Sequence, residues 1–182
     1  LQANGVPVLA EGQAQGRTIW ATGAQGLAQM SANHHRLVGA GVKGQAAVLD
    51  HAAPGAPQLF ADGVHIIPHE DGTTAIGSTS ERDFDDPSAT DALLDDVIAR
   101  ARAAVPALAD APVIGRWAGL RPRTRSRAPM LGAHPLHAGQ FIANGGFKIG
   151  FGMAPKVGQV MADLVLDGVD TIPEGFRPEA SL

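Results

Sequence analysis

One arginine of this chain stands where a guanidinium could bind a carboxylate. The segment WAGLRPRTRSRAPMLG, residues 117–132, sets Arg121 directly after a short apolar run that is typical of a β-strand. A guanidinium carries its N–H donors in a fixed planar fork, which matches the two oxygens of a carboxylate. This pattern therefore indicates a site for a small acidic substrate.

A glycine-rich segment, NGGFKIGFGMAP, follows at residues 144–155 and runs into an apolar helical pattern. Backbone N–H groups of such a turn, together with the N-terminus of a helix, attract an electron-rich group. Lys148 adds a full positive charge. The segment predicts a site for an anion or for the edge of a cofactor; a loop made flexible by glycine, with an exposed lysine, is the alternative.

Three more arginines follow Arg121 at alternate positions, Arg123, Arg125 and Arg127. In an extended chain, alternate residues lie on one face. One substrate cannot neutralise four positive charges, so we interpret the last three as a solvated basic edge. A phosphate or nucleic-acid site on this row is an alternative, although no aromatic residues are interleaved for base stacking.

Other possible sites are weaker. His65 is a lone histidine on an expected strand, and such a residue is either structural or a substrate contact. The histidines lack the spacing of metal ligands, so we expect no metal site. Residues 39–44 read GAGVKG, a literal GxGxxG, but a strand pattern follows where a dinucleotide site needs a helix. No serine lies in a GxSxG motif, which argues against hydrolase chemistry.

The composition is that of a globular protein. The chain has 182 residues, of which 45% are hydrophobic and 18% charged. It contains no apolar run of about 18 residues, so we expect no membrane-spanning segment. A net charge of −4 argues against general affinity for nucleic acids. The absence of cysteine fits a reducing compartment, and we expect a cytoplasmic protein.

Strand patterns outnumber helical ones. Residues 17–21 predict a buried strand that ends in a turn at residues 22–24. The glycine, proline and acidic residues around 70–72 predict a hairpin between two strands. The expected strands are residues 17–21, 42–50, 63–68, 73–78, 112–120 and 140–144.

Two helices are expected. The first is capped by Asp86, carries apolar residues at helical spacing from Leu93 to Val105 and ends by Pro106. The second spans residues 156–166 with Gly168 as its C-cap, and a loop tail follows from residue 170. This order predicts an α+β fold, in which helices cover one face of a mixed or antiparallel sheet.

The two motifs, in this order, resemble the D-amino-acid oxidase and glycine oxidase family of FAD-dependent oxidoreductases. The resemblance extends to Gly44-Gln45, which matches a structural glycine-glutamine turn of the family, and to residues 65–82 and 21–24. It implies oxidation of a small amino acid or amine by hydride transfer to FAD, with Arg121 on the substrate carboxylate. No general base is implied, because hydride transfer from a neutral amine does not demand one.

The resemblance also implies roles for other residues. Lys148 and His65 are expected substrate contacts; relatives place a tyrosine where His65 stands, and this chain has no tyrosine. The glycine-rich turn is expected along the flavin ring, with the helix start at its pyrimidine edge. The expected cofactor contacts are Val8, Gly23, Gly145, Gly146, Phe147, Lys148, Ile149, Gly150, Phe151 and Gly152.

The family's domain order predicts three parts: a remnant of the FAD-binding domain at 1–40, a substrate-binding domain at 41–140, and a flavin-contacting turn, helix and tail at 141–182. The dinucleotide-binding strand, turn and helix that open such enzymes are not in this sequence. We therefore expect the C-terminal half of a larger oxidoreductase, inactive alone and poor at retaining FAD. The alternative is a non-enzymatic ligand-binding or assembly module, whose apolar face a partner or a second copy would cover.

Overall fold

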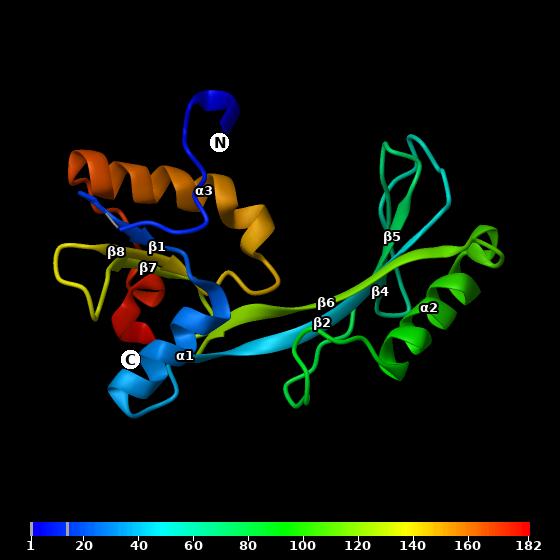
Figure 1. Cartoon of the computed structure of the whole chain (residues 1–182), viewed down its shortest axis with the longest axis horizontal. Helices are drawn as coiled ribbons and strands as arrows, with labels where there is room; N and C mark the ends of the chain where they lie inside the picture. The colour runs from blue at the N-terminus through cyan, green and yellow to red at the C-terminus, as the bar shows by residue number, and fades with distance from the viewer. Residues whose placement is uncertain (1, 14) are drawn as a thin grey trace.

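A pair of long strands joins two β-sheets in the computed structural model, which describes residues 2–13 and 15–182 (Figure 1). Its strands are β1 (Ile19–Trp20), β2 (Gly39–Leu49), β3 (Leu59–Ala61), β4 (Val64–Pro68), β5 (Thr74–Gly77), β6 (Val113–Thr124), β7 (Met130–Ala133) and β8 (Phe141–Asn144). Its α-helices are α1 (Gly23–His34), α2 (Ala92–Ala104) and α3 (Gly150–Ala162). None of the described helices is both long enough and apolar enough to cross a membrane.

The larger sheet is antiparallel throughout. Its strand order is β3-β4-β5-β2-β6. The smaller sheet has the order β1-β8-β7, with β1 parallel and β7 antiparallel to β8. The predicted α+β class with a mixed or antiparallel sheet is therefore confirmed in its architecture.

β2 and β6 form the long ribbon between the two ends of the molecule (Figure 1). They pair from Gly39 opposite Thr124 to Leu49 opposite Val113, with a register shift after Val48. Since side chains alternate along a strand, every second residue of β2 points to the same face. Lys43, Gln45, Ala47 and Leu49 share the face that α2 covers, whereas Val42, Gly44 and Ala46 share the other face with Arg121.

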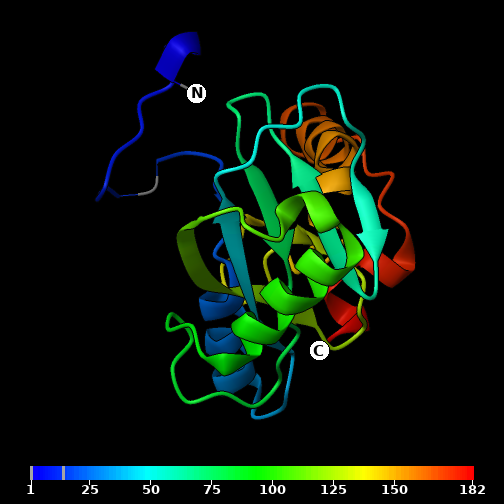
Figure 2. The same cartoon turned by 90° about the vertical axis from the view of Figure 1, so that its right-hand side faces the viewer.

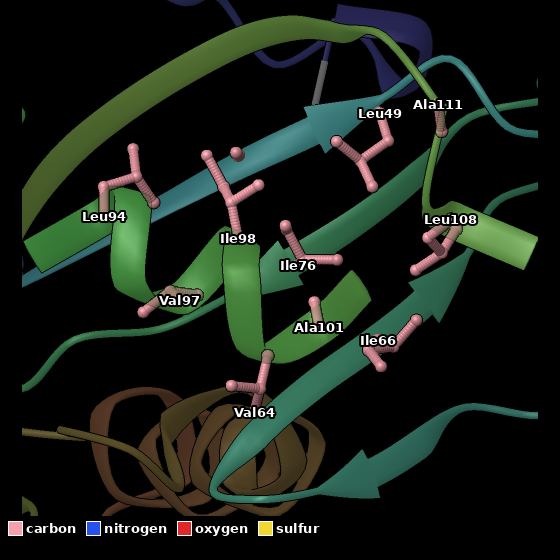
Figure 3. Close-up of a cluster of buried hydrophobic side chains, with 11 residues drawn as sticks. Leu49, Val64, Ile66, Ile76, Leu94, Val97, Ile98, Ala101, Leu108 and Ala111 are labelled. Carbon is pink, nitrogen blue, oxygen red and sulfur yellow. The ribbon is translucent and has the colours of Figure 1, made fainter. Parts of the chain in front are cut away.

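α2 lies across one face of the larger sheet and closes the main hydrophobic core (Figures 2 and 3). It buries Leu94, Val97, Ile98 and Ala101, which recur at helical spacing. These side chains meet Leu49, Val64, Ile66 and Ile76 from the strands. The predicted helix and the predicted hairpin of β4 and β5 are both confirmed.

Two smaller cores stabilise the other end. α1 packs Leu27 and Met30 against Val38, Met130 and Ile142. α3 and the π-helical turn that follows it, Asp163–Asp167, enclose a third cluster. Its buried members are Leu131, Val160, Met161, Val165 and Ile172. Both clusters hold helices onto the smaller sheet and so fix the start of α3 relative to β6.

Several predicted boundaries were wrong. The cap of α2 is Asp91, whose side chain accepts a hydrogen bond from Leu93 N at 3.0 Å; Asp86 instead closes a local turn with Ser88. β1 is short and leaves Ile19 43% exposed, because β1 is an edge strand and not a buried one. Residues 22–24 do not form a turn, since α1 begins at Gly23.

Other differences lie near the C-terminus. α3 begins at Gly150, well before Lys156, although Gly168 does take the predicted left-handed C-cap conformation. The tail contains short 3-10 turns at Glu174–Phe176 and Pro178–Ala180 where a loop was expected. β3 and β7 were not predicted. Leu1 and Ala14 of the expected 1–40 segment lie outside the described residues.

Candidate functional site

The Arg121 side chain lies on the face of the larger sheet that α2 does not cover. It projects from β6 opposite Val42 and turns toward the segment after β5. Nη1 donates a hydrogen bond to the Thr79 carbonyl at 3.2 Å, and Nη2 donates one to Ser78 Oγ at 2.5 Å. Two of its five N–H donors are thus used on neutral oxygens, and the others remain available.

Arg121 has no direct counter-charge among the described residues. In the part of the chain that the structure describes, no carboxylate forms an ion pair with it. Partial burial lowers the pKa of the Arg121 guanidinium below its ordinary value, while the Glu81 carboxylate acts in the opposite direction. An arginine stays protonated at neutral pH in either case. The result is a half-buried positive charge that can accept an anion.

Gly44 makes room for this guanidinium. A Cβ at Gly44 would lie 2.0 Å from Arg121 Nη1 and 2.3 Å from Cζ, far inside van der Waals contact. The arginine therefore lies flat against the β2 backbone because that position lacks a side chain. Sequence reasoning assigned Gly44-Gln45 to a structural turn; both residues lie within β2, and Gly44 is part of the arginine site.

The glycine-rich turn is tied to the strand that carries Arg121. Phe147 N donates to the Pro122 carbonyl at 3.1 Å, and Gly146 forms a β-bridge with Arg123. Gly145 has a φ of +75°, and a Cβ there would lie 2.3 Å from Thr124 Cγ2. The bonds to β6 bring the two motifs of the sequence together in space.

Asn144 is a residue of this region that sequence reasoning missed. Its buried side chain donates from Nδ2 to the Gly23 carbonyl at 3.0 Å and accepts from Gly145 N at 2.7 Å. It thereby links the start of α1 to the glycine-rich turn. An asparagine directly before two glycines was the available signal, since its amide can pair with nearby backbone groups.

A cavity of about 560 Å³ lies between the β3–β5 strands and the glycine-rich turn. Its lining residues are Phe60, Gly63, His65, Ser78, Arg121, Phe147, Lys148 and Phe151. Two of them carry positive charge, and no acidic side chain is among these described lining residues. The ring of Phe147 lies 5.6 Å from Lys148 Nζ and 5.8 Å from Arg123 Cζ, within cation–π range. The cavity therefore suits an anion with an apolar part.

His65 lines the same cavity from β4. Its Nδ1 lies 2.9 Å from Gln58 Nε2, and its ring lies 4.5 Å from that of Phe60. In the tautomer whose Nε2 carries the proton, Nδ1 accepts a hydrogen bond from the Gln58 amide and Nε2 can donate one to a ligand in the cavity.

The structure brings together only part of the predicted site. Arg121, His65, Phe147, Lys148 and Phe151 line one cavity. Gly146 and Gly150 line an adjacent apolar cavity of about 270 Å³ beneath α3, and Gly145, Ile149 and Gly152 line neither of the two. Val8 is exposed on the N-terminal segment and Gly23 begins α1, so neither residue lies at the Arg121 cavity.

The N-terminus of α3 faces this region with its positive end uncompensated. Ile149, the N-cap residue, supplies no side-chain cap, and the first turn of this described helix has no acidic residue. The unpaired N–H groups at a helix start carry about half a positive charge. An electron-rich group can therefore be stabilised there.

The predicted row of four arginines does not exist as a single face. β6 ends at Thr124, and the turn after it redirects the chain. Arg125 donates to the carbonyl oxygens of Ser181 at 3.0 Å and Leu182 at 2.7 Å, so it holds the C-terminal tail. Arg127 sits in the turn with a φ of +70°. These four arginines therefore do not form one continuous basic surface.

The described residues contain no cluster of metal-binding side chains. Within the described residues, no group of three or more His, Cys, Asp or Glu side chains could hold a metal ion. The chemistry of the site rests on cations, backbone dipoles and aromatic rings. Among the described residues, the antiparallel sheet sets an arginine without a carboxylate partner beside a glycine-rich turn and a helix start without a side-chain cap. Such a set of groups is typical of domains that bind an anionic or electron-rich ligand.

Comparison with known proteins identifies the family. The model of the FAD-dependent oxidoreductase (DAO) family matches residues 2–164. The chain is 35% identical over 144 residues to the glycine oxidase of Pseudomonas putida, covering 78% of this chain and 39% of that protein. It is 33% identical over 129 residues to the glycine oxidase of Bacillus subtilis, covering 69% of this chain and 34% of that protein. The chain belongs to the DAO family of FAD-dependent oxidoreductases.

Solved structures agree with this assignment. The crystal structure of glycine oxidase from Geobacillus kaustophilus superposes with a TM-score of 0.75 at 28% identity, covering 88% of this chain and 44% of that one. Iminodiacetate oxidase from Chelativorans sp. BNC1 superposes with a TM-score of 0.76 at 26% identity, covering 91% of this chain and 47% of that one. The chain thus spans about two fifths of the length of the relatives it matches.

Proposed function

We propose that this chain forms the substrate-binding part of an enzyme that oxidises a small amino acid or amine with FAD. The observation that carries the proposal is Arg121. This partly buried cation lines a cavity and has no direct carboxylate partner in the part of the chain that the structure describes. Such a group binds a carboxylate strongly, because each charge-assisted hydrogen bond contributes about 1.5–3 kcal/mol. The glycine oxidases among the relatives support this reading.

The residues present fit a flavin on the far side of the cavity. Phe147 and Phe151 offer apolar surface, and Phe151 is fully exposed. The uncapped start of α3 and Lys148 supply positive charge on that side. FAD, when bound, would accept a hydride from the carbon next to the amine nitrogen, and water would then hydrolyse the resulting imine.

The contribution of the chain itself is to hold and orient the substrate. Arg121 would bind the substrate carboxylate through its free N–H groups, so that the amine-bearing carbon faces the flavin side of the cavity. His65 would donate a further hydrogen bond from the opposite wall. Lys148 would stabilise negative charge near the glycine-rich turn. No residue of the chain is proposed as a general base.

The domain division follows the same proposal. Residues 41–140 would form the substrate-binding domain, while 1–40 and 141–182 would pack against an FAD-binding part. The proposed cofactor contacts are Val8, Gly23, Gly145, Gly146, Phe147, Lys148, Ile149, Gly150, Phe151 and Gly152. The proposed contacts in the glycine-rich turn are supported by the hydrogen bonds between this turn and β6. The proposed contacts of Val8 and Gly23 are supported by the family resemblance alone.

The proposed substrate is small and carries a carboxylate. A glycine oxidase among the relatives and an iminodiacetate oxidase among the structural neighbours are both named for a small carboxylate that carries an amine. Where relatives place a tyrosine, this chain has His65, whose ring lies tilted 4.5 Å from that of Phe60 and lines the cavity of about 560 Å³. We therefore propose that the substrate is glycine or a small amino acid with a secondary amine.

Substitution of the arginine tests the proposal. The chain is titrated with glycine, and with glycinamide, which lacks the carboxylate, while amide signals are followed by NMR. We expect glycine to bind and Arg121→Met to weaken its binding by about tenfold or more. Arg116→Met, on the same strand but paired with Asp95, serves as the control. Equal affinity for glycine in Arg121→Met and in the unaltered chain would contradict the proposal.

The redox step is tested on the protein purified with FAD. Addition of glycine without oxygen should bleach the visible absorbance of the flavin, and Arg121→Met should require a higher glycine concentration for the same rate. Because this chain alone is expected to retain FAD poorly, the test uses the longer oxidoreductase of which the proposal makes it a part. If that protein is colourless and takes up no added FAD, flavin chemistry is excluded.

A further inference from the structure

We propose that Glu81 is a positioning residue for Arg121 and acts on it through Thr79 from the opposite face of the sheet. The inference rests on the proposed role of Arg121 as the carboxylate-binding group. It explains a polar cluster that the proposed reaction does not use. This cluster, called here the Lys43 cluster, consists of Lys43, Gln45, Glu81 and Asp91.

The Lys43 cluster lies beneath α2, at the edge of the main core. Lys43 is only 3% exposed and pairs with Glu81 Oε2 at 3.7 Å and Asp91 Oδ2 at 3.6 Å. Gln45 is fully buried; its Nε2 donates to Glu81 Oε1 at 3.1 Å and to Asp91 Oδ1 at 2.8 Å, and its Oε1 accepts from Asp91 N at 2.8 Å. Every member of the cluster therefore has a partner.

Thr79 connects this cluster to the arginine. Its hydroxyl donates to Glu81 Oε1 and accepts from Gln45 N at 2.8 Å. Its own N–H donates to the Gln45 carbonyl at 3.2 Å. Its carbonyl accepts from Arg121 Nη1 at 3.2 Å, and the preceding Ser78 accepts from Nη2. One residue is thus fixed by the cluster on one side and holds the guanidinium on the other.

Glu81 is placed so that it supports Arg121 without neutralising it directly. One oxygen is occupied by Thr79 and Gln45, and the other faces the Lys43 ammonium group. Glu81 and Lys43 also exchange two backbone hydrogen bonds of 2.9 Å, which fix the Glu81 backbone beside β2. Because the carboxylate is held in this way, it does not form an ion pair with Arg121. The free donors of Arg121 remain available to a substrate.

Lys43 and Glu81 hold opposite charges in a largely buried position, with side chains 3% and 11% exposed, and stability alone does not explain this pair. Removing charged groups from water costs several kcal/mol each, and a buried ion pair can often be replaced by apolar residues without loss of stability. The neighbouring positions of β2 on the same face, Ala47 and Leu49, are apolar and pack well. A fixed geometry for Thr79 is what the Lys43 cluster adds.

The order of the Arg121 side chain is the direct readout. The Nε–H signal of Arg121 is followed by NMR relaxation in the unaltered chain and in Glu81→Gln, together with the affinity for acetate as a carboxylate probe. We expect Arg121 to become mobile in Glu81→Gln and acetate to bind about five- to tenfold more weakly. Asp96→Asn, which removes one exposed carboxylate paired with Arg100, is the matched control and should change neither readout.

Substitutions at Thr79 separate positioning from general stability. Glu81→Gln leaves Lys43 with one carboxylate and could unfold the chain, so Thr79→Val and Thr79→Ser are compared as well. Both keep the backbone, but only serine keeps the hydroxyl that links Glu81 and Gln45. We expect Thr79→Val to mobilise Arg121 and Thr79→Ser to leave it ordered, at similar thermal midpoints.

The outcomes distinguish this inference from the proposed function. An Arg121 side chain that stays ordered, with unchanged acetate affinity, in both Glu81→Gln and Thr79→Val would overturn the positioning role. An Arg121 that loosens in these variants while the unaltered chain binds no acetate would support positioning and would count against carboxylate binding by Arg121.

Discussion

The guanidinium of Arg121 lies directly over the backbone of Gly44 on the neighbouring strand, with Nη1 only 2.0 Å from the place where a Cβ would stand. A side chain at that position must displace the guanidinium. Since Arg121 also bonds to Ser78 and Thr79, its displacement breaks the arrangement that leaves its other donors free. Gly44 is therefore as much a part of the proposed anion site as Arg121.

Gly44→Ala should lower the affinity for a small carboxylate by about tenfold or more, because charge-assisted hydrogen bonds of about 1.5–3 kcal/mol lose their geometry. NMR titration with acetate measures this change. Gly119→Ala is the control, since Gly119 lies directly opposite Gly44 and has open space around its own Cβ position. Equal affinities in the two variants would show that the guanidinium adapts and that Gly44 is dispensable.

Gly145→Ala should distort the glycine-rich turn and destabilise the chain more than Gly139→Ala. Both glycines have a positive φ, which costs another residue about 1–2 kcal/mol. Only Gly145 has a neighbour in the way, Thr124 Cγ2 at 2.3 Å, whereas Gly139 is in open space. Urea denaturation measures the difference in stability, and shifts in the amide signals of Phe147 and Lys148 report on the turn. Matching stabilities would indicate that Thr124 moves aside without cost.

Leu94→Ala should destabilise the chain by about 2–5 kcal/mol, because it leaves a hole in the main core beneath α2. Leu94 is fully buried within the cluster that Figure 3 shows. The preceding Leu93 is 52% exposed. Leu93→Ala should therefore change the stability by about 0.5 kcal/mol or less. Chemical denaturation of the two variants beside the unaltered chain makes the comparison. A small effect of Leu94→Ala would mean that α2 does not close the core.

The chain should become less stable at acidic pH, in part because of His134. Burial first, and the nearby His137 second, hold the pKa of His134 below its ordinary value of 6.5. The unfolded chain then takes up a proton at higher pH than the folded chain does. The contribution of His134 to the free energy of unfolding is therefore fully present above pH 6.5. It decreases as the pH falls below 6.5 and becomes constant below the pKa of the folded state.

Thermal midpoints between pH 7.5 and pH 5 test this prediction, at about half-unit steps around the histidine range. The midpoint of His134→Gln should fall less over this range than that of the unaltered chain. His69→Gln, at an exposed residue next to the hairpin turn, is the control and should follow the unaltered chain. Parallel curves of thermal midpoint against pH for all three proteins would contradict the role of His134 in the loss of stability.

Local patterns determined much of the fold from the sequence. Apolar residues at helical spacing identified α2, and the turn signal at residues 70–72 identified the hairpin of β4 and β5. α1 was missed because its sequence is rich in glycine, alanine and glutamine and has no side-chain cap, so it shows little apolar periodicity. Its helical state depends on packing of Leu27 and Met30 against strands far along the chain.

The sequence by itself also pointed to Arg121 and to the glycine-rich turn, because their residue types carry a specific chemistry and resemble a known family. Only the tertiary structure decided what surrounds them. It placed Gly44 beneath the guanidinium, divided the arginine row at Thr124 and joined Glu81 to Arg121 through Thr79. The reason is physical, because residue type fixes which bonds a side chain can form. The partners of Arg121, Thr79 and Ser78, lie 42 and 43 positions away along the chain, and only folding brings them to it.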